Sequence, residues 1–211
     1  MNKGFFITLE GGEGAGKSTL LEGLRAHLAS RGIDPVLTRE PGGTRLGEGV
    51  RALVLGPEHG EVCAESELLL MFAARAQLVR EVLQPALNAG RCVLCDRFAD
   101  ASYAYQGGGR GQPVERIAAL EQWAVDGLVP DLTLLLDLPV DTGRSRIAGR
   151  AASDRIEGEN DSFFERVRKA YQARAAAEPQ RFRLIDASQS ADRVLACAIA
   201  AIDDLLEARR A

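Results

Sequence analysis

Residues 11–18 form a glycine-rich segment, GGEGAGKS, which matches the phosphate-binding pattern G-x-x-x-x-G-K-[ST]. Its glycines let backbone N–H groups turn toward one point and approach a phosphate closely. The ammonium of Lys17 can reach the β- and γ-phosphates of a nucleotide, and the hydroxyl of Ser18 can bind Mg²⁺. The alternative is a flexible glycine turn, but the segment lies between a predicted strand and a predicted helix, which favours the phosphate site. The residues predicted to bind the nucleotide cofactor here are Gly11, Gly12, Glu13, Gly14, Ala15, Gly16, Lys17, Ser18 and Thr19.

Two apolar runs end in an aspartate, Asp96 after VLC and Asp137 after LLL. Either carboxylate could lie at a strand end and hold a metal ion near the phosphate loop. Asp96 is followed at once by Arg97, an anion-binding group, whereas no polar residue directly follows Asp137. We therefore predict Asp96 and Ser18 as the Mg²⁺ ligands. A structural salt bridge between Asp96 and Arg97 is the alternative.

The absence of other motifs narrows the class of nucleotide-binding protein. A GTPase normally carries an N-K-x-D motif that reads guanine, and none of the three asparagines fits this pattern. Large ATPase motors need more chain than 211 residues, and a net charge of −4 argues against a nucleic-acid partner. We favour a small-molecule kinase, which needs an acceptor pocket, a metal carboxylate and arginines that neutralise the transferred charge. The alternatives are a kinase for a deoxynucleoside or another monophosphate, and a nucleotide-binding regulatory module without turnover.

The length of the apolar runs indicates where the protein is located. No run of 18 apolar residues occurs, so we expect no transmembrane helix, no membrane partner and, by default, a cytoplasmic protein.

The four cysteines are too few for a disulfide framework. Cys92 and Cys95 form a C-x-x-C within an apparent strand, where residues three apart point to opposite faces. We predict core cysteines, with a metal or redox pair as the alternative.

Short apolar runs alternate with helical patterns along the whole chain. This alternation predicts a single α/β domain over 1–211, with a parallel sheet covered by helices on both faces and ligands at the carboxyl ends of its strands. The longest segment without regular structure is expected at 40–60, and a lid at about 141–160, whose mobile part is 149–160. The predicted strands are 5–10, 35–40, 92–97, 132–138 and 183–188, and the predicted helices are 18–32, 65–88, 113–127, 140–150, 161–177 and 190–209.

A series of segments, in order and at sensible spacing, resembles the bacterial thymidylate kinase (dTMP kinase) family over almost the whole chain. The segments are EGGEGAGKS, TREPGGT, LLLMFAARAQL, DRF, AYQGGGRG, PDLTLLLDL, DRIE and IDAS. The resemblance implies a P-loop fold with a five-stranded parallel sheet. It also implies ATP-dependent phosphorylation of dTMP to dTDP for dTTP biosynthesis, with Mg²⁺ as cofactor, and a homodimer.

The same resemblance implies how the acceptor base is read. Phe72 and Arg75 lie three apart on a predicted helix, so they share a face. The family likeness assigns Phe72 to stacking on the base and Arg75 to the thymine O4 acceptor, where cytosine carries a donor amine. The alternative is a core phenylalanine beside a snorkelling arginine.

Ser102, Tyr105 and Gln106 would share a face if 99–106 is helical, and they are further acceptor-site candidates. Gln106 can pair with a base edge through its amide, and Tyr105 can pack against a sugar that lacks a 2′-hydroxyl. The family resemblance assigns Glu13 to the sugar 3′-hydroxyl. It also implies a cis peptide bond at Glu40–Pro41.

Arginines are the candidates for phosphate binding and charge neutralisation. Arg39 and Arg97 sit at predicted strand ends, where planar guanidinium groups can hold the acceptor phosphate. By resemblance, Arg150 reaches the transferred phosphoryl group from the lid and Arg146 stacks on adenine. An exposed surface charge is the alternative for each. We predict direct in-line transfer without a protein nucleophile, with Lys17, Arg97, Arg150 and Asp96 as the catalytic residues.

Overall fold

The computed structural model describes residues 4–148 and 154–209. Five parallel strands form one sheet in the order β2-β3-β1-β4-β5. The predicted α/β fold with a five-stranded parallel sheet is confirmed, and each predicted strand lies within two residues of its observed bounds. The strands are β1 (Phe5–Gly11), β2 (Val36–Arg39), β3 (Cys92–Asp96), β4 (Leu132–Asp137) and β5 (Phe182–Asp186).

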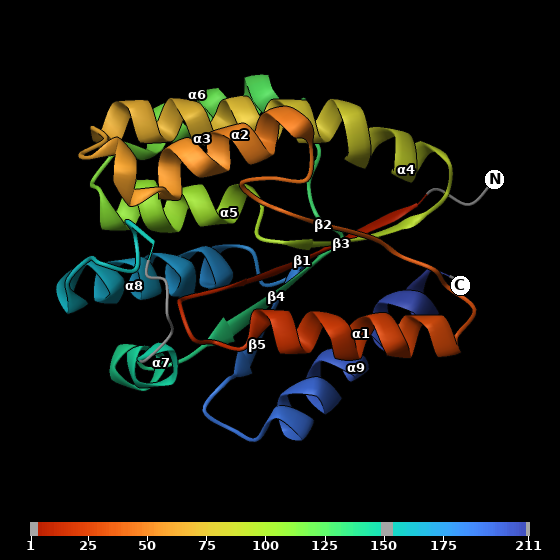
Figure 1. Ribbon diagram of the computed structural model, residues 1–211. Coiled ribbons are helices and arrows are strands. Elements are labelled where there is room, and N and C mark those ends of the chain that lie inside the picture. The colour runs from red at the N-terminus through yellow and green to blue at the C-terminus, as the bar shows by residue number, and fades with distance from the viewer. Residues whose placement is uncertain (1–3, 149–153, 210–211) are drawn as a thin grey trace.

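Helices cover both faces of the sheet, as Figure 1 shows. Helices α1 (Lys17–Ser30) and α9 (Ala191–Ala208) pack on one face, and α3 (Ala64–Leu78) and α6 (Val114–Val125) on the other. Cys92 belongs to the first of these two cores and Cys95 to the second, so the predicted opposite orientation is confirmed. Burial raises the pKa of Cys92 to about 12, so this thiol stays protonated at neutral pH.

The expectation of an irregular segment at 40–60 was wrong, because this stretch contains α2 (Arg45–Leu55) and the short 3-10 helix η1 (Pro57–His59). The Thr44 hydroxyl caps α2 by accepting a hydrogen bond from the Gly47 N–H at 2.9 Å. Glycines lower intrinsic helix propensity here, but tertiary packing outweighs it. The packing cluster consists of Val50 and Val54 from α2 with Met71 and Ala74 from α3.

The predicted helix 65–88 is continuous but changes pitch. Helix α3 passes into a π-helical segment, η2 (Val79–Leu83), and then into α4 (Gln84–Asn88). A second wide turn, η3 (Tyr103–Gly109), follows α5 (Ala99–Ser102), and such π segments are frequent at functional sites.

The two remaining helices are α7 (Val140–Ile147), which begins where 140–150 was predicted, and α8 (Asp161–Ala177), whose bounds match the prediction. Within 4–148 and 154–209, no helix combines the length and the apolar character needed to cross a bilayer.

Candidate active site

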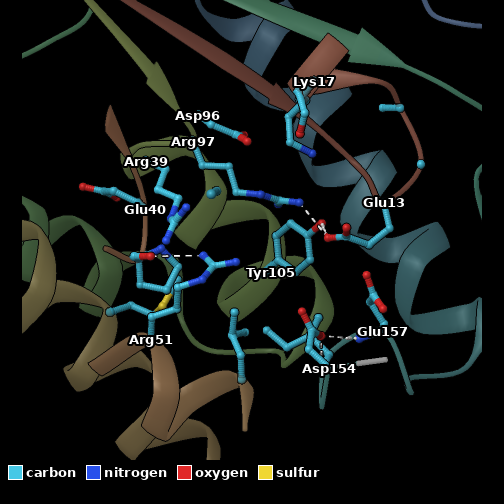
Figure 2. A pocket seen from close by; sticks show the side chains of 18 of the residues that line it. Glu13, Lys17, Arg39, Glu40, Arg51, Asp96, Arg97, Tyr105, Asp154 and Glu157 are labelled. Atoms are coloured by element: carbon cyan, nitrogen blue, oxygen red, sulfur yellow. Dashed lines mark hydrogen bonds and ion pairs between the residues drawn. The ribbon is translucent and has the colours of Figure 1, made fainter. Parts of the chain in front are cut away.

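A cavity of about 300 Å³ opens at the carboxyl ends of β1, β2 and β3. In Figure 2, Lys17 and Glu13 lie on one side of it, Arg39 and Arg51 on the opposite side, and Arg97 between them. The structure therefore brings most of the predicted site residues to one place. The residues around it are Glu13, Gly14, Ala15, Gly16, Lys17, Ser18, Thr19, Arg39, Glu40, Pro41, Arg51, Leu55, Met71, Asp96, Arg97, Ala101, Tyr105, Gln106, Asp154, Ile156 and Glu157.

The glycine-rich segment forms a tight loop between β1 and α1. Gly14 and Gly16 have φ angles of 72° and 92°, which favour glycine. A Cβ on Gly14 would lie 2.2 Å from the carbonyl oxygen of Gly143 in α7, so the close approach also requires glycine. Helix α1 begins at Lys17, which directs its N-terminal end toward the cavity. This is the geometry of an anion-binding loop.

The Lys17 ammonium lies inside this loop, where it donates to the carbonyl oxygens of Gly11 and Gly12 at 3.2 Å each. Burial and then the nearby charge of Arg97 lower the pKa of Lys17, although Glu13 opposes this. When a phosphate binds, Lys17 can exchange these two carbonyl contacts for contacts with the phosphate oxygens.

Arg97 is held in a strained backbone conformation at the end of β3. Its φ angle is 72°, which costs a non-glycine residue on the order of 1–3 kcal/mol, and its N–H donates to the Leu9 carbonyl at 2.9 Å. The side chain pairs with the Glu13 carboxylate at 2.6 Å and lies over the Tyr105 ring, 4.6 Å from its centroid. The strain therefore directs a guanidinium across the cavity rather than toward Asp96.

The Glu13 carboxylate accepts hydrogen bonds from Arg97 and, at 3.0 Å, from the Tyr105 hydroxyl. Burial alone would raise the pKa of Glu13. The charges of Arg97 and Lys17, together with these hydrogen bonds, outweigh burial and lower the pKa to about 2. Glu13 is therefore ionised at neutral pH and can accept a hydrogen bond from a hydroxyl.

The two strand-end aspartates differ in their partners. Asp137 is held by Arg168 through two bonds of 2.7 and 2.9 Å and by Gln172 at 3.1 Å. The Oδ1 atom of Asp96 is buried and has no hydrogen-bond partner among the described residues. Asp96 and the exposed Ser18 border the same cavity. One carboxylate and one hydroxyl beside a phosphate loop suit Mg²⁺, which keeps several waters and phosphate oxygens as ligands.

Two arginines, Arg39 and Arg51, line the side of the cavity opposite the phosphate loop (Figure 2). Arg39 pairs with Glu48 at 2.9 Å, and both side chains are about half exposed, so the pair is weak. Arg51 donates to the Pro41 carbonyl at 3.1 Å. The sequence reading missed Arg51 because α2 was not expected. Thr44 could have been recognised as a helix N-cap, which would have predicted a helix that includes Arg51, seven residues later.

Phe72, Arg75 and Ser102 lie behind the cavity wall rather than on it, which differs from the sequence prediction. Arg75 is fully buried, and its N–H groups donate to Glu40 at 2.7 Å, to Ser102 at 3.0 Å and to the Phe98 carbonyl at 3.1 Å. Phe72 packs in the core beneath, with the Arg75 guanidinium 4.5 Å from its ring centroid. The neighbouring residue on α3 that faces the cavity is Met71. The Glu40–Pro41 peptide is cis, as the family resemblance implies.

The residues named from the predicted lid, 141–160, divide into three groups. Arg146 is exposed and donates to the Ala187 carbonyl at 3.0 Å and weakly to Gly14, next to the phosphate loop but outside the cavity. Arg150 lies outside the described residues. Asp154, Ile156 and Glu157 line the cavity.

Comparisons with known proteins show the family to which this chain is similar. A family model described as Thymidylate kinase matches residues 9–197. The thymidylate kinase of Pseudomonas putida (strain GB-1) is 59% identical over 191 residues, which cover 90% of this chain and 91% of that protein. The thymidylate kinases of Pseudomonas syringae pv. syringae (strain B728a) and Ectopseudomonas mendocina (strain ymp) are each 56% identical over 207 residues, which cover 98% of this chain and 99% of each relative. By this match over nearly its full length, the chain belongs to the thymidylate kinase family.

Proposed function

We propose that this protein transfers the γ-phosphoryl group of ATP to dTMP, which gives dTDP and ADP. The observation that carries the proposal is a single cavity with a phosphate loop on one side and three arginines, Arg39, Arg51 and Arg97, in its wall. Two phosphate-bearing ligands can meet end to end in such a cavity. The relatives are thymidylate kinases, which supports dTMP as the acceptor.

ATP binds on the side of the phosphate loop in this proposal. The loop N–H groups and Lys17 hold its phosphates, and Arg146 lies beside the loop where an adenine can stack on it. Ser18 and Asp96 would hold Mg²⁺, which when bound neutralises charge on the phosphate oxygens. The buried, unpartnered Oδ1 of Asp96 supports this assignment.

The acceptor dTMP binds on the opposite side. Arg97, Arg39 and Arg51 hold its phosphate, because guanidinium groups bind phosphate oxygens bidentately. Glu13 accepts from a sugar hydroxyl, and Tyr105 packs against the sugar. Met71 and Gln106 contact the base, while Phe72, Arg75 and Ser102 support this wall from behind. This assignment of Phe72 replaces stacking on the base, since its ring lies in the core.

The chemistry is a direct in-line displacement. An oxygen of the acceptor phosphate attacks the γ-phosphorus, the bond from this phosphorus to the β,γ-bridging oxygen breaks, and ADP leaves. The protein contributes position and positive charge, from Lys17, Arg97 and, as the sequence predicts, Arg150. No side chain has to act as a nucleophile, and His27 and His59, which contact Asp203 and Glu58, do not line the cavity.

A panel of nucleotides tests the proposal. The protein is incubated with MgATP and either dTMP, dUMP, dCMP or dGMP, and the diphosphate products are quantified. We expect dTDP to form with the highest kcat/KM. Absence of dTDP, or faster turnover of another monophosphate, would overturn the proposed function.

We also propose that the protein is a homodimer. The supporting observation is that α2, α3 and α6, three helices on the same side of the sheet (Figure 1), each carry exposed apolar side chains. Sedimentation of the purified protein tests this. The exposed residues are Leu46, Leu53, Leu69, Val114 and Trp123.

A further inference from the structure

Glu67 is a fully buried carboxylate on α3 that no step above uses. Its Oε1 atom accepts from the Gln106 amide at 2.9 Å and from Arg110 at 3.3 Å. Its Oε2 atom accepts from Arg155 and is paired with Arg110 at 3.3 Å. Burial alone would raise the pKa of Glu67, but the hydrogen bonds from Arg155 and Gln106 and the charge of Arg110 outweigh it and lower the pKa. Glu67 is therefore an ionised acceptor.

An ionised carboxylate can only accept hydrogen bonds, so it determines which end of the Gln106 amide faces it. The amide nitrogen of Gln106 must point to Glu67, which leaves the carbonyl oxygen Oε1 on the other side. This oxygen is buried and has no hydrogen-bond partner among the described residues, although Gln106 borders the cavity. A buried carbonyl without a donor is costly, so a ligand that supplies an N–H there gains affinity.

We propose that Glu67 is a specificity-determining positioning residue, which fixes the Gln106 amide so that its carbonyl accepts the N3–H of the acceptor base. This inference rests on the proposed function. Thymine and uracil carry a donor at N3, whereas cytosine carries an acceptor there. With the amide held in this orientation, the Gln106 carbonyl opposes the cytosine N3 lone pair, and cytosine is rejected.

The variant Glu67→Gln reverses the orientation with almost no change in shape. Arg155 and Arg110 can only donate, and both contact the Oε2 position, so they hold the new side-chain carbonyl there. The longer 3.3 Å hydrogen bond from Arg110 Nε to the Oε1 position is lost in this variant. The new NH₂ then lies where Oε1 was and faces Gln106, whose amide must turn to accept from it. The turned amide presents NH₂ to the cavity, which suits cytosine N3 and opposes thymine N3–H.

The test measures kcat/KM for dTMP, dCMP and dUMP with the full-length protein. We expect Glu67→Gln to lower the dTMP to dCMP ratio by at least about tenfold, the scale of one mismatched buried hydrogen bond. The dTMP to dUMP ratio should stay within about twofold, because both bases carry N3–H. A general loss of structure would lower all three values and leave both ratios unchanged.

The matched control is Glu65→Gln, two residues earlier on α3. Glu65 is an exposed carboxylate that contacts Gln112 at 3.3 Å and lies outside the cavity. We expect both ratios to match those of the unmodified protein. In a Gln106→Met background, which has no amide to turn, Glu67→Gln should no longer change the dTMP to dCMP ratio.

The outcomes separate this inference from the proposed function. If the unmodified protein phosphorylates dTMP but Glu67→Gln keeps the dTMP to dCMP ratio, only the role of Glu67 is overturned. If the unmodified protein does not phosphorylate dTMP, the proposed function fails first. If Glu67→Gln does not fold, neutron diffraction of the unmodified protein decides. Gln106 deuterons toward Glu67 support the inference, and deuterons toward the cavity overturn it.

Discussion

The guanidinium of Arg97 lies 2.6 Å from the carboxylate of Glu13, and this ion pair joins the end of β3 to the phosphate loop. The sequence assigned these two residues to different parts of the acceptor, the phosphate and the sugar. In the structure their charges neutralise each other beside Lys17. When the acceptor binds, Arg97 can exchange this ion pair for contacts with a phosphate, and Glu13 can exchange it for a hydrogen bond from a hydroxyl.

The Glu13–Arg97 pair makes stability depend on pH. The pKa of Glu13 falls from 4.5 to about 2 on folding, so its ionised form stabilises the native state above pH 4.5, and this contribution is lost as the pH falls toward 2. In urea unfolding we expect the unmodified protein to exceed Glu13→Gln in free energy of unfolding at about pH 6, with the difference narrowing toward about pH 3. A difference that stays constant or widens on acidification would contradict the assignment. Replacing the exposed Glu115 of α6 by Gln gives the control.

Lys17 is expected to contribute to catalysis rather than to folding. Lys17→Ala should lower kcat for dTDP formation by roughly 10²–10³, the scale for removing one preorganised charge from developing negative charge. Circular dichroism should show an unchanged fold. The comparison is Lys169→Ala on the exposed face of α8, which should keep the original kcat. Retention of full activity by Lys17→Ala would refute the loop assignment.

Asp96 and Asp137 provide a matched pair at two strand ends. Asp96→Asn should lower kcat by roughly 10²-fold and raise the Mg²⁺ concentration needed for half-maximal rate, because it removes a charged metal ligand. Asp137→Asn loses the partly exposed pair with Arg168, so we expect about 1 kcal/mol of lost stability and an unchanged kcat. The opposite pattern would move the metal site to β4.

Met71 and Phe72 test which side chain of α3 contacts the base. Met71→Ala should raise the KM for dTMP by roughly tenfold or more, since a buried apolar side chain contributes about 1.5–3 kcal/mol. Phe72→Leu should cost about 1–2 kcal/mol of stability but leave KM within about twofold, because the ring lies in the core. A large KM effect from Phe72→Leu at unchanged stability would restore the stacking role.

Much of the fold could be predicted because its signals are local. The central strands β1, β3 and β4 are buried on both faces along most of their length and contain continuous apolar runs, and the phosphate loop lies between one strand and one helix. Helix α2 was not predicted because Gly47 and Gly49 weaken its local helix signal. Its stability comes from contacts of Val50 and Val54 with α3, which the sequence pattern of α2 does not reveal.

The sequence predicted which residues belong to the candidate site better than it predicted which side chains contact one another there. Lys17, Asp96 and Arg97 were recognisable from strand-end and loop positions, whereas the Asp137–Arg168 and Glu67–Gln106 contacts join residues more than thirty positions apart. One-residue differences in helical facing, as between Met71 and Phe72, depend on how α3 is rotated against the sheet. Periodicity alone does not determine that rotation.

The central claim is that ATP and the acceptor meet phosphate to phosphate in one cavity. The most direct measurement is calorimetric titration with a single molecule that joins adenosine and thymidine through five phosphates. We expect one molecule bound per chain, at least about 100-fold more tightly than dTMP, with the gain lost in both Lys17→Ala and Arg97→Ala. Binding no tighter than that of ATP or dTMP alone, or two molecules per chain, would contradict the account.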